Sequence, residues 1–192
     1  MSTFDWTGEN PGLVLRDGDE GPATTLASLF RVVRSPYGYG HATFYIRDPQ
    51  TPGAPNACYT DNEELAVWLQ EEFLRHFEPY QGLPGLEELA MVEAEFGFEA
   101  GSGDPWIETV RTVEETLEFR WSDLSEPFLV DHGPAESPTG KHRLISVFQA
   151  AGSAEIRVNG EKVPGAPMPR HLGGRDMTSA FLAFSETWIR EE

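Results

Sequence analysis

The stretch that decides the fold is TSAFLAFSETW at residues 178–188. Side chains of a β-strand alternate between its two faces. The alternation predicts one face with Leu182, Phe184, Glu186 and Trp188, and another with Phe181, Ala183, Ser185 and Thr187. Both faces carry large apolar groups, whereas a strand with one face in water has one polar face. We therefore expect protein on both sides of this strand, as in a closed barrel or a two-layer sandwich.

Glu186 lies among apolar neighbours in this stretch. A buried carboxylate is costly unless it is paired or used chemically. Burial raises the pKa of a carboxyl group, which suits it to general acid catalysis. The structural alternative is a pairing with Arg120, Arg143 or a buried tyrosine hydroxyl.

Further short strands are predicted on the N-terminal side of this stretch. Residues 92–99 alternate apolar and acidic side chains, and residues 116–122 alternate in the same way. Asn159-Gly160 is a strong signal for a β-hairpin between residues 154–158 and 161–163. About eight to ten short strands separated by turn residues indicate a mainly β protein, an antiparallel barrel or barrel-like sandwich.

The clearest predicted helix covers residues 61–77. Asp61, followed three residues later by Glu64, resembles a capping box, and an apolar stripe runs along one side: Leu65, Trp68, Leu69, Phe73 and Phe77. A helical turn is also expected over residues 24–33, leading into a strand at residues 41–47, with Leu29–Val33 as a strand the alternative. Residues 1–22 are expected to form an extended N-terminal arm, in which Leu13-Val14-Leu15 suits a short edge strand, and residues 23–192 a single β-barrel domain.

A helix inserted among the strands of an antiparallel barrel resembles the lipocalin-like (calycin) architecture. The likeness is one of architecture, because the Gly-x-Trp signature typical of lipocalins is absent. It implies an interior cavity that holds one small ligand.

The net charge of −18 disfavours nucleic acid and anionic membrane surfaces as partners. A cationic ligand would be attracted, although solubility alone explains an acidic surface. Cys58 is the only cysteine, which fits a reducing compartment. The sequence shows no signal peptide and no apolar run long enough to span a bilayer, so we expect a cytoplasmic protein.

Two loops carry residues with chemical potential. One holds Asp131, His132 and His142, which suit a divalent metal ion, an acid/base role for His132, or an exposed polar turn, although no known metal-ligand spacing occurs. The other runs from Tyr37 to Tyr45 with glycines between its aromatic residues. It suits one rim of a ligand pocket, formed by Tyr37, Tyr39, His41 and Tyr45, or a turn that packs on the sheet.

We expect binding of a small, largely apolar molecule in the barrel cavity, without a cofactor, since no phosphate loop, dinucleotide fingerprint or nucleophile elbow occurs. Aromatic residues expected either to line the cavity or to fill a solid core are Phe96, Phe98, Phe119, Trp121, Phe148, Phe184 and Trp188. One alternative is a cofactor-independent isomerase, hydratase or lyase that uses Glu186 or His132. Another is an interaction module or homodimer.

Overall fold

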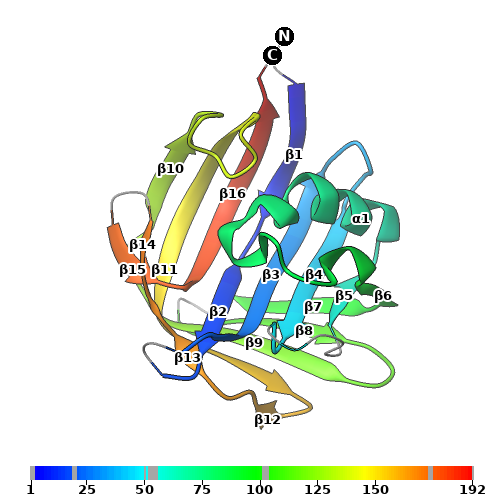
Figure 1. Ribbon diagram of the computed structural model, residues 1–192, viewed down its shortest axis with the longest axis vertical. Helices are drawn as coiled ribbons and strands as arrows, with labels where there is room; N and C mark the ends of the chain where they lie inside the picture. The colour runs from blue at the N-terminus through cyan, green and yellow to red at the C-terminus, as the bar shows by residue number, and fades with distance from the viewer. Residues whose placement is uncertain are drawn as a thin grey trace.

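The computed structural model describes residues 3–18, 21–49, 51, 56–100, 104–172 and 175–191. Over these residues the protein is mainly β, with one α-helix, α1 (Glu63–Glu72), as Figure 1 shows. Three short 3-10 helices follow α1: η1 (Leu74–His76), η2 (Glu78–Tyr80) and η3 (Leu86–Glu88). No helix in this part of the chain has the length and apolar character needed to cross a membrane.

Most strands belong to one large, mainly antiparallel sheet in the order β6-β5-β4-β3-β1-β16-β11-β9-β8-β7. Their bounds are β1 (Thr3–Glu9), β3 (Ala23–Arg34), β4 (Gly40–Arg47), β5 (Ala57–Thr60), β6 (Ala90–Glu93), β7 (Glu95–Ala100), β8 (Trp106–Arg111), β9 (Thr116–Leu124), β11 (His142–Val158) and β16 (Ala180–Arg190). Attached to this path are β2 (Gly12–Arg16), β10 (Phe128–His132), β12 (Glu161–Lys162) and β13 (Ala166–Pro167). A separate hairpin joins β14 (Pro169–Leu172) to β15 (Arg175–Thr178).

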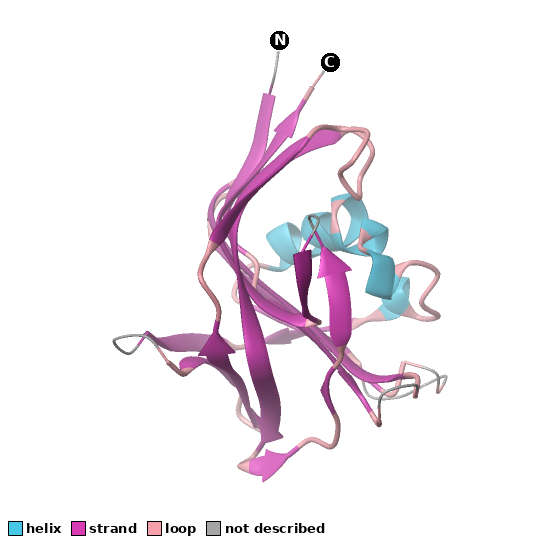
Figure 2. Cartoon of the chain, turned by 90° about the vertical axis from the view of Figure 1, so that its left-hand side faces the viewer, coloured by secondary structure: helices cyan, strands magenta, loops and turns pink. Residues whose placement is uncertain are grey.

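The long strand β11 divides the sheet into two layers. Its first half pairs with β10 and β16, and its second half, from Ala151, pairs with β9. In Figure 1 the second layer, with β7, β8 and β9, crosses behind the first. Figure 2 shows the helices on the opposite side of the first layer. The first layer is therefore covered on both faces, by helix on one side and by strands on the other.

Two apolar clusters fill these two spaces. The helix-side cluster packs Leu69 of α1 and its C-cap residue Phe73 against Phe30, Phe44 and other residues of the first layer. The inter-sheet cluster lies between the layers and contains Tyr45, Phe119, Trp121 and Leu182, together with other residues of both layers. The expectation that β16 is covered on both sides is confirmed, since Trp188 belongs to the first cluster and Leu182 to the second.

The predicted division of β16 into faces needs a correction. Val147 of β11 pairs with Phe184, but Ile145 pairs with Thr187, so β16 carries one extra residue in a bulge. Ser185 in this bulge has a φ of 50°. The extra residue inverts the alternation, which moves Glu186 and Trp188 to the face of Phe181 and away from that of Phe184.

The segment predicted as a helical turn, residues 24–33, is instead strand β3. Its apolar residues recur at a helix-like spacing because the strand is buried on both faces, where periodicity does not separate strand from helix. Leu26 and Phe30 contact the helix-side cluster, and Leu29 contacts the inter-sheet cluster. Val33, the fourth residue of the supposed stripe, is 70% exposed.

The segment expected to be an N-terminal arm contains β1 and β2, which are interior strands. β1 pairs with both β3 and β16, and β2 pairs with the same two strands and with β13. Trp6 has no exposed surface. The Gly- and acid-rich composition that suggested an arm therefore conceals β1, whereas β2 coincides with the short strand considered at Leu13-Val14-Leu15, as an interior and not an edge strand.

The predicted helix is confirmed, with shorter bounds. Asn62, rather than Asp61, is the N-cap, because its side chain accepts a hydrogen bond from the Leu65 backbone N–H at 3.1 Å. The carboxylate of Asp61 instead accepts the backbone N–H of His41 at 2.6 Å. The Asn159-Gly160 hairpin is also confirmed: both residues have positive φ, 51° and 84°, and Val158 pairs with Glu161.

Candidate functional site

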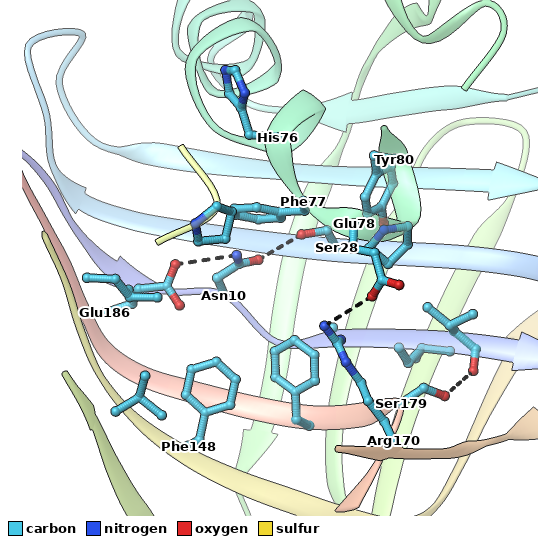
Figure 3. A pocket seen from close by; sticks show the side chains of 18 of the residues that line it. Asn10, Ser28, His76, Phe77, Glu78, Tyr80, Phe148, Arg170, Ser179 and Glu186 are labelled. Atoms are coloured by element: carbon cyan, nitrogen blue, oxygen red, sulfur yellow. Dashed lines mark hydrogen bonds and ion pairs between the residues drawn. The ribbon is translucent and has the colours of Figure 1, made fainter. Parts of the chain in front are cut away.

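A pocket of about 290 Å³ lies between the helix-side face of the first layer and the η1–η2 segment. Figure 3 shows its side chains arriving from segments far apart in sequence. Its apolar walls include Leu13, Val14, Phe77, Tyr80, Leu144, Phe148, Phe181 and Trp188. The rings of Phe148 and Phe181 stack with centroids 4.9 Å apart, so part of the wall is a pre-formed aromatic surface.

Glu186 is the buried acid of this pocket. The bulge at Ser185 turns its side chain toward the helix side, where only 2% of the residue is exposed. Burial raises the pKa of its carboxyl group to about 7, and hydrogen bonds from Trp188 and Asn10 partly oppose that rise. At neutral pH both the neutral and the charged forms of the Glu186 carboxyl group are therefore populated.

A short chain of neutral hydrogen bonds holds Glu186 in place. Its Oε1 accepts from Trp188 Nε1 at 2.7 Å and from Asn10 Nδ2 at 3.5 Å. Asn10 Oδ1 in turn accepts from the Ser28 hydroxyl at 2.8 Å. No residue in the described part of the chain donates a hydrogen bond to Glu186 Oε2. One oxygen of a buried carboxylate is thus left for whatever occupies the pocket.

Two side chains of opposite charge lie at the exposed rim of the pocket. Glu78 of η2 and Arg170 of β14 both line it, and their side chains approach to 3.7 Å. Both also line a neighbouring hollow of about 600 Å³. Because the Glu78 side chain is 83% exposed, this ion pair lies at the rim and joins the helical segment to the β14–β15 hairpin.

Four residues predicted from the sequence meet in this pocket: Glu186, His132, Phe148 and Trp188. The two predicted acid/base candidates thus share one site, although they are 54 positions apart in sequence (186 − 132). Glu186 has neither Arg120 nor Arg143 as a partner, since Arg120 pairs with Glu118 and Arg143 with Asp131.

The other predicted aromatic residues lie elsewhere. Tyr45, Phe119 and Trp121 are buried in the inter-sheet cluster, with Phe96 and Phe184 packed against it. Of the two readings left open for these residues, the solid core is the one that describes Phe119 and Trp121, which have no exposed surface.

The predicted aromatic rim is also separate from the pocket. Tyr39 is 79% exposed, and Tyr37 packs against Trp68 of α1. His41 stacks on Phe96 and pairs with Asp61, which fits the turn reading for this loop. Phe98 is 55% exposed, and its ring is covered by the guanidinium of Arg31.

Sequence reasoning missed Asn10, Ser28, Arg170 and the η1–η2 segment. Ser28 did carry a signal, because it is a lone polar residue within the apolar run of β3 and is only 4% exposed. Asn10 precedes Pro11-Gly12, a combination typical of a turn. The local sequence therefore did not indicate that Asn10 is buried.

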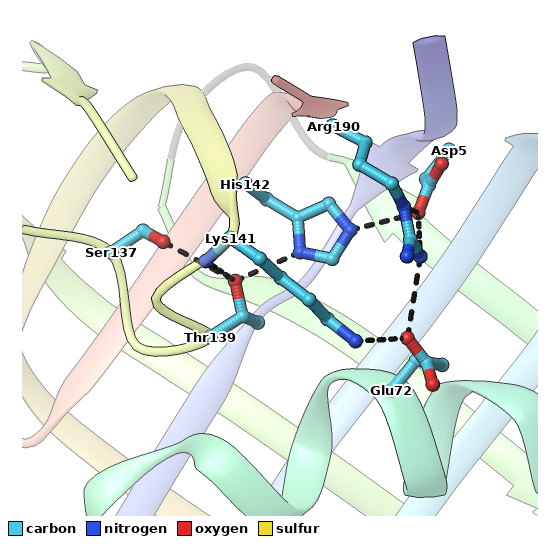
Figure 4. Close-up of polar contacts among 7 residues, drawn as sticks. All are labelled: Asp5, Glu72, Ser137, Thr139, Lys141, His142 and Arg190. Carbon is cyan, nitrogen blue, oxygen red and sulfur yellow. Dashed lines mark hydrogen bonds and ion pairs between the residues drawn. The ribbon is translucent and has the colours of Figure 1, made fainter. Parts of the chain in front are cut away.

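A second polar cluster, the His142 network, lies near the two chain ends (Figure 4). Asp5 Oδ2 accepts from His142 Nε2 at 2.8 Å and from Arg190 Nη2 at 2.8 Å. Because a carboxylate only accepts, His142 Nε2 carries the proton, and Nδ1 accepts from the Thr139 hydroxyl at 2.8 Å. Glu72 of α1 bonds both Lys141 and Arg190, so the network ties four elements together.

This network has the hydroxyl–imidazole–carboxylate order of an activated nucleophile. His142, however, has no exposed surface, and neither it nor Thr139 lines the pocket beside Glu186. Burial lowers the pKa of the His142 imidazole, which is only partly offset by Asp5. We therefore assign the network to the stability of the fold.

No family model matches the chain, and it has no significant match among curated proteins or solved structures. Across the described residues, no three His, Cys, Asp or Glu side chains are grouped so that they could hold a metal ion. The function proposed below is therefore based on the geometry of the pocket.

Proposed function

We propose that the protein binds a small, largely apolar molecule in the pocket beside Glu186. The observation that carries the proposal is an aromatic-walled pocket with one buried acid and a few polar groups, a composition typical of small-molecule sites. A dry cavity of about 150 Å³ holds one benzene ring. A pocket of about 290 Å³ therefore suits a ligand about the size of two rings.

The position of the pocket differs from the cavity expected from the sequence. We infer that the sheet is a barrel of the calycin type whose interior is the inter-sheet cluster. Support comes from β6 and β7, the two ends of the strand order, which are separated only by Ala94, whose N–H donates to Thr60 O at 3.1 Å. Backbone nuclear Overhauser effects between β6 and β7 beyond the Ala94 junction would support this closure, and their absence would argue for an open seam.

The binding proposal is tested by filling the pocket. Val14 is half-buried and lines it, so Val14→Trp should block entry. Val33→Trp adds the same side chain at a position that is 70% exposed and away from the pocket. We expect the neutral apolar dye N-phenylnaphthylamine to bind wild type and Val33→Trp saturably, and Val14→Trp at least about tenfold more weakly.

Circular dichroism and thermal unfolding establish that both variants are folded. Equal dye binding by Val14→Trp and wild type, or no saturable binding by wild type, would refute the proposal. Native mass spectrometry of freshly purified protein then identifies any co-purified molecule.

A cofactor-independent isomerase, hydratase or lyase is a second candidate. It is favoured by Glu186, with a pKa of about 7, lining the same pocket as His132. Turnover that is lost in Glu186→Gln while ligand binding persists would distinguish this enzyme from a binding protein.

A further inference from the structure

We propose that the ligand of this pocket is an organic amine whose ammonium group pairs with Glu186 and whose apolar body packs on the aromatic walls. This inference rests on the proposed binding function and adds the charge and chemical class of the ligand.

One carboxylate oxygen of Glu186, Oε2, is available to a ligand. Both of its protein donors, Trp188 Nε1 and Asn10 Nδ2, bond the same atom, Oε1. Glu186 lines the pocket, and no donor from the described residues reaches Oε2. A carboxylate has room for several donors, and a buried one is strongly disfavoured while it lacks them. An ammonium group supplies up to three N–H donors at the point where the protein supplies none.

Glu186 also lacks a cationic protein partner among the described residues. Arg170 is the one arginine that lines the pocket, and it is engaged by Glu78 at the rim. Neither donor to Glu186 carries a charge. The ionised form of Glu186 thus lacks the counter-charge that buried carboxylates normally have.

The negative charge of the pocket and of the whole chain also favours a cationic ligand. The acids that line the pocket are Glu78, Glu136 and Glu186, against Arg170 as the fixed cation. The whole chain carries a net charge of −18, which raises the local concentration of cations and repels anions. A carboxylate or phosphate ligand would meet this field and Glu186 together, so an anionic ligand is disfavoured.

The protonation of Glu186 makes the proposal testable by pH. Its pKa of about 7 means that ionisation is largely complete at pH 8 and slight at pH 6, whereas an alkylamine stays protonated at both. Among the described residues, the other titratable or charged groups facing the pocket are His76, Glu78, Tyr80, His132, Glu136 and Arg170. Their contribution to any pH dependence persists in Glu186→Gln, so the variant isolates that of Glu186.

The experiment is isothermal titration calorimetry with three probes of one shape: phenylbutylamine, phenylbutanol and phenylbutanoate. At pH 8 wild type should bind the amine at least about tenfold more tightly than the alcohol, and the carboxylate most weakly. Glu186→Gln should bring the amine to within about twofold of the alcohol while affinity for the alcohol is retained. Glu161→Gln removes the same charge at an exposed position of β12 and should keep the full preference.

A wild-type measurement makes the test independent of the variant's folding. Between pH 6 and pH 8 the affinity for the amine should rise about tenfold, following the ionised fraction of Glu186, while that for the alcohol stays constant. Equal affinity for amine and alcohol at pH 8, or an amine preference that persists in Glu186→Gln, overturns the amine inference and leaves binding intact. Failure of all three probes to bind overturns the proposed function itself.

Discussion

Asp5 and Glu186 are both buried carboxylates, on two strands that pair with each other, yet their surroundings are opposite. Asp5 is bonded by His142 and by the guanidinium of Arg190. Among the described residues, Glu186 is bonded only by the neutral groups of Trp188 and Asn10. The comparison separates a carboxylate that stabilises the fold from one that is left for a ligand, because Asp5 has the cationic partner Arg190 and lies outside the pocket, whereas Glu186 has neutral donors and lines it.

The largest expected effect on stability comes from removing Asp5, the carboxylate that has a charged partner. Asp5→Ala leaves the buried His142 Nε2–H without an acceptor and removes the main partner of Arg190. We expect the free energy of unfolding to fall by about 3 kcal/mol, because a buried donor loses its acceptor and a charge-assisted hydrogen bond to Arg190 is removed. Urea denaturation at pH 7 measures this loss.

The matched control is Asp131→Ala, which removes an exposed carboxylate that pairs with Arg143 at 2.7 Å. Because that pair is in water, we expect urea denaturation to show little change. Equal losses in the two variants would contradict a stabilising role for the His142 network.

An effect of opposite sign and of no greater size is expected at Glu186. Between the ordinary carboxyl pKa of 4.5 and about 7, the folded protein keeps Glu186 protonated and the unfolded chain does not. The folded state then binds more protons, so the unfolding free energy falls as pH rises through this window. At pH 8 we expect Glu186→Gln to be more stable than wild type by about 3 kcal/mol, since the pKa rises by about 2.5 units (7 − 4.5) and each unit corresponds to about 1.4 kcal/mol.

The measurement is the unfolding free energy of both proteins from pH 4 to pH 8. The advantage of Glu186→Gln should disappear toward the acid end, where the wild-type carboxyl is protonated in both states. Glu108, whose pKa burial also raises to about 7, titrates in both proteins and cancels in their difference. A constant difference across this range would show that Glu186 is not the titrating group.

The smallest effect on stability is expected at the rim. Arg170 pairs with the largely exposed Glu78 at 3.7 Å, and exposed pairs contribute about 0.5 kcal/mol or less. Arg170→Ala should therefore leave the melting temperature nearly unchanged. Stopped-flow binding of N-phenylnaphthylamine should show faster association and dissociation, because the contact between η2 and the β14–β15 hairpin is gone. Unchanged rates would exclude a gating role for this pair.

The sequence predicted the local elements well where one pattern had one cause. The apolar stripe over residues 61–77 placed the helix, and Asn159-Gly160 placed its hairpin. It failed where burial on both faces removed the alternation, as in β3, and where polar composition concealed a strand, as in β1. Of the residues that line the pocket, the sequence had pointed to Glu186, His132, Phe148 and Trp188 but not to Asn10, Ser28 or Arg170.

What the amino-acid sequence determined by itself is a mainly β chain whose C-terminal strand is covered on both sides, because side-chain periodicity is a local property of a strand. Only the tertiary structure decided where Glu186 points. One extra residue in the bulge at Ser185 moves it from the interior between the layers to the pocket under η1 and η2. Register and bulges depend on partner strands distant in the chain, so no window of sequence around residue 186 contains that information.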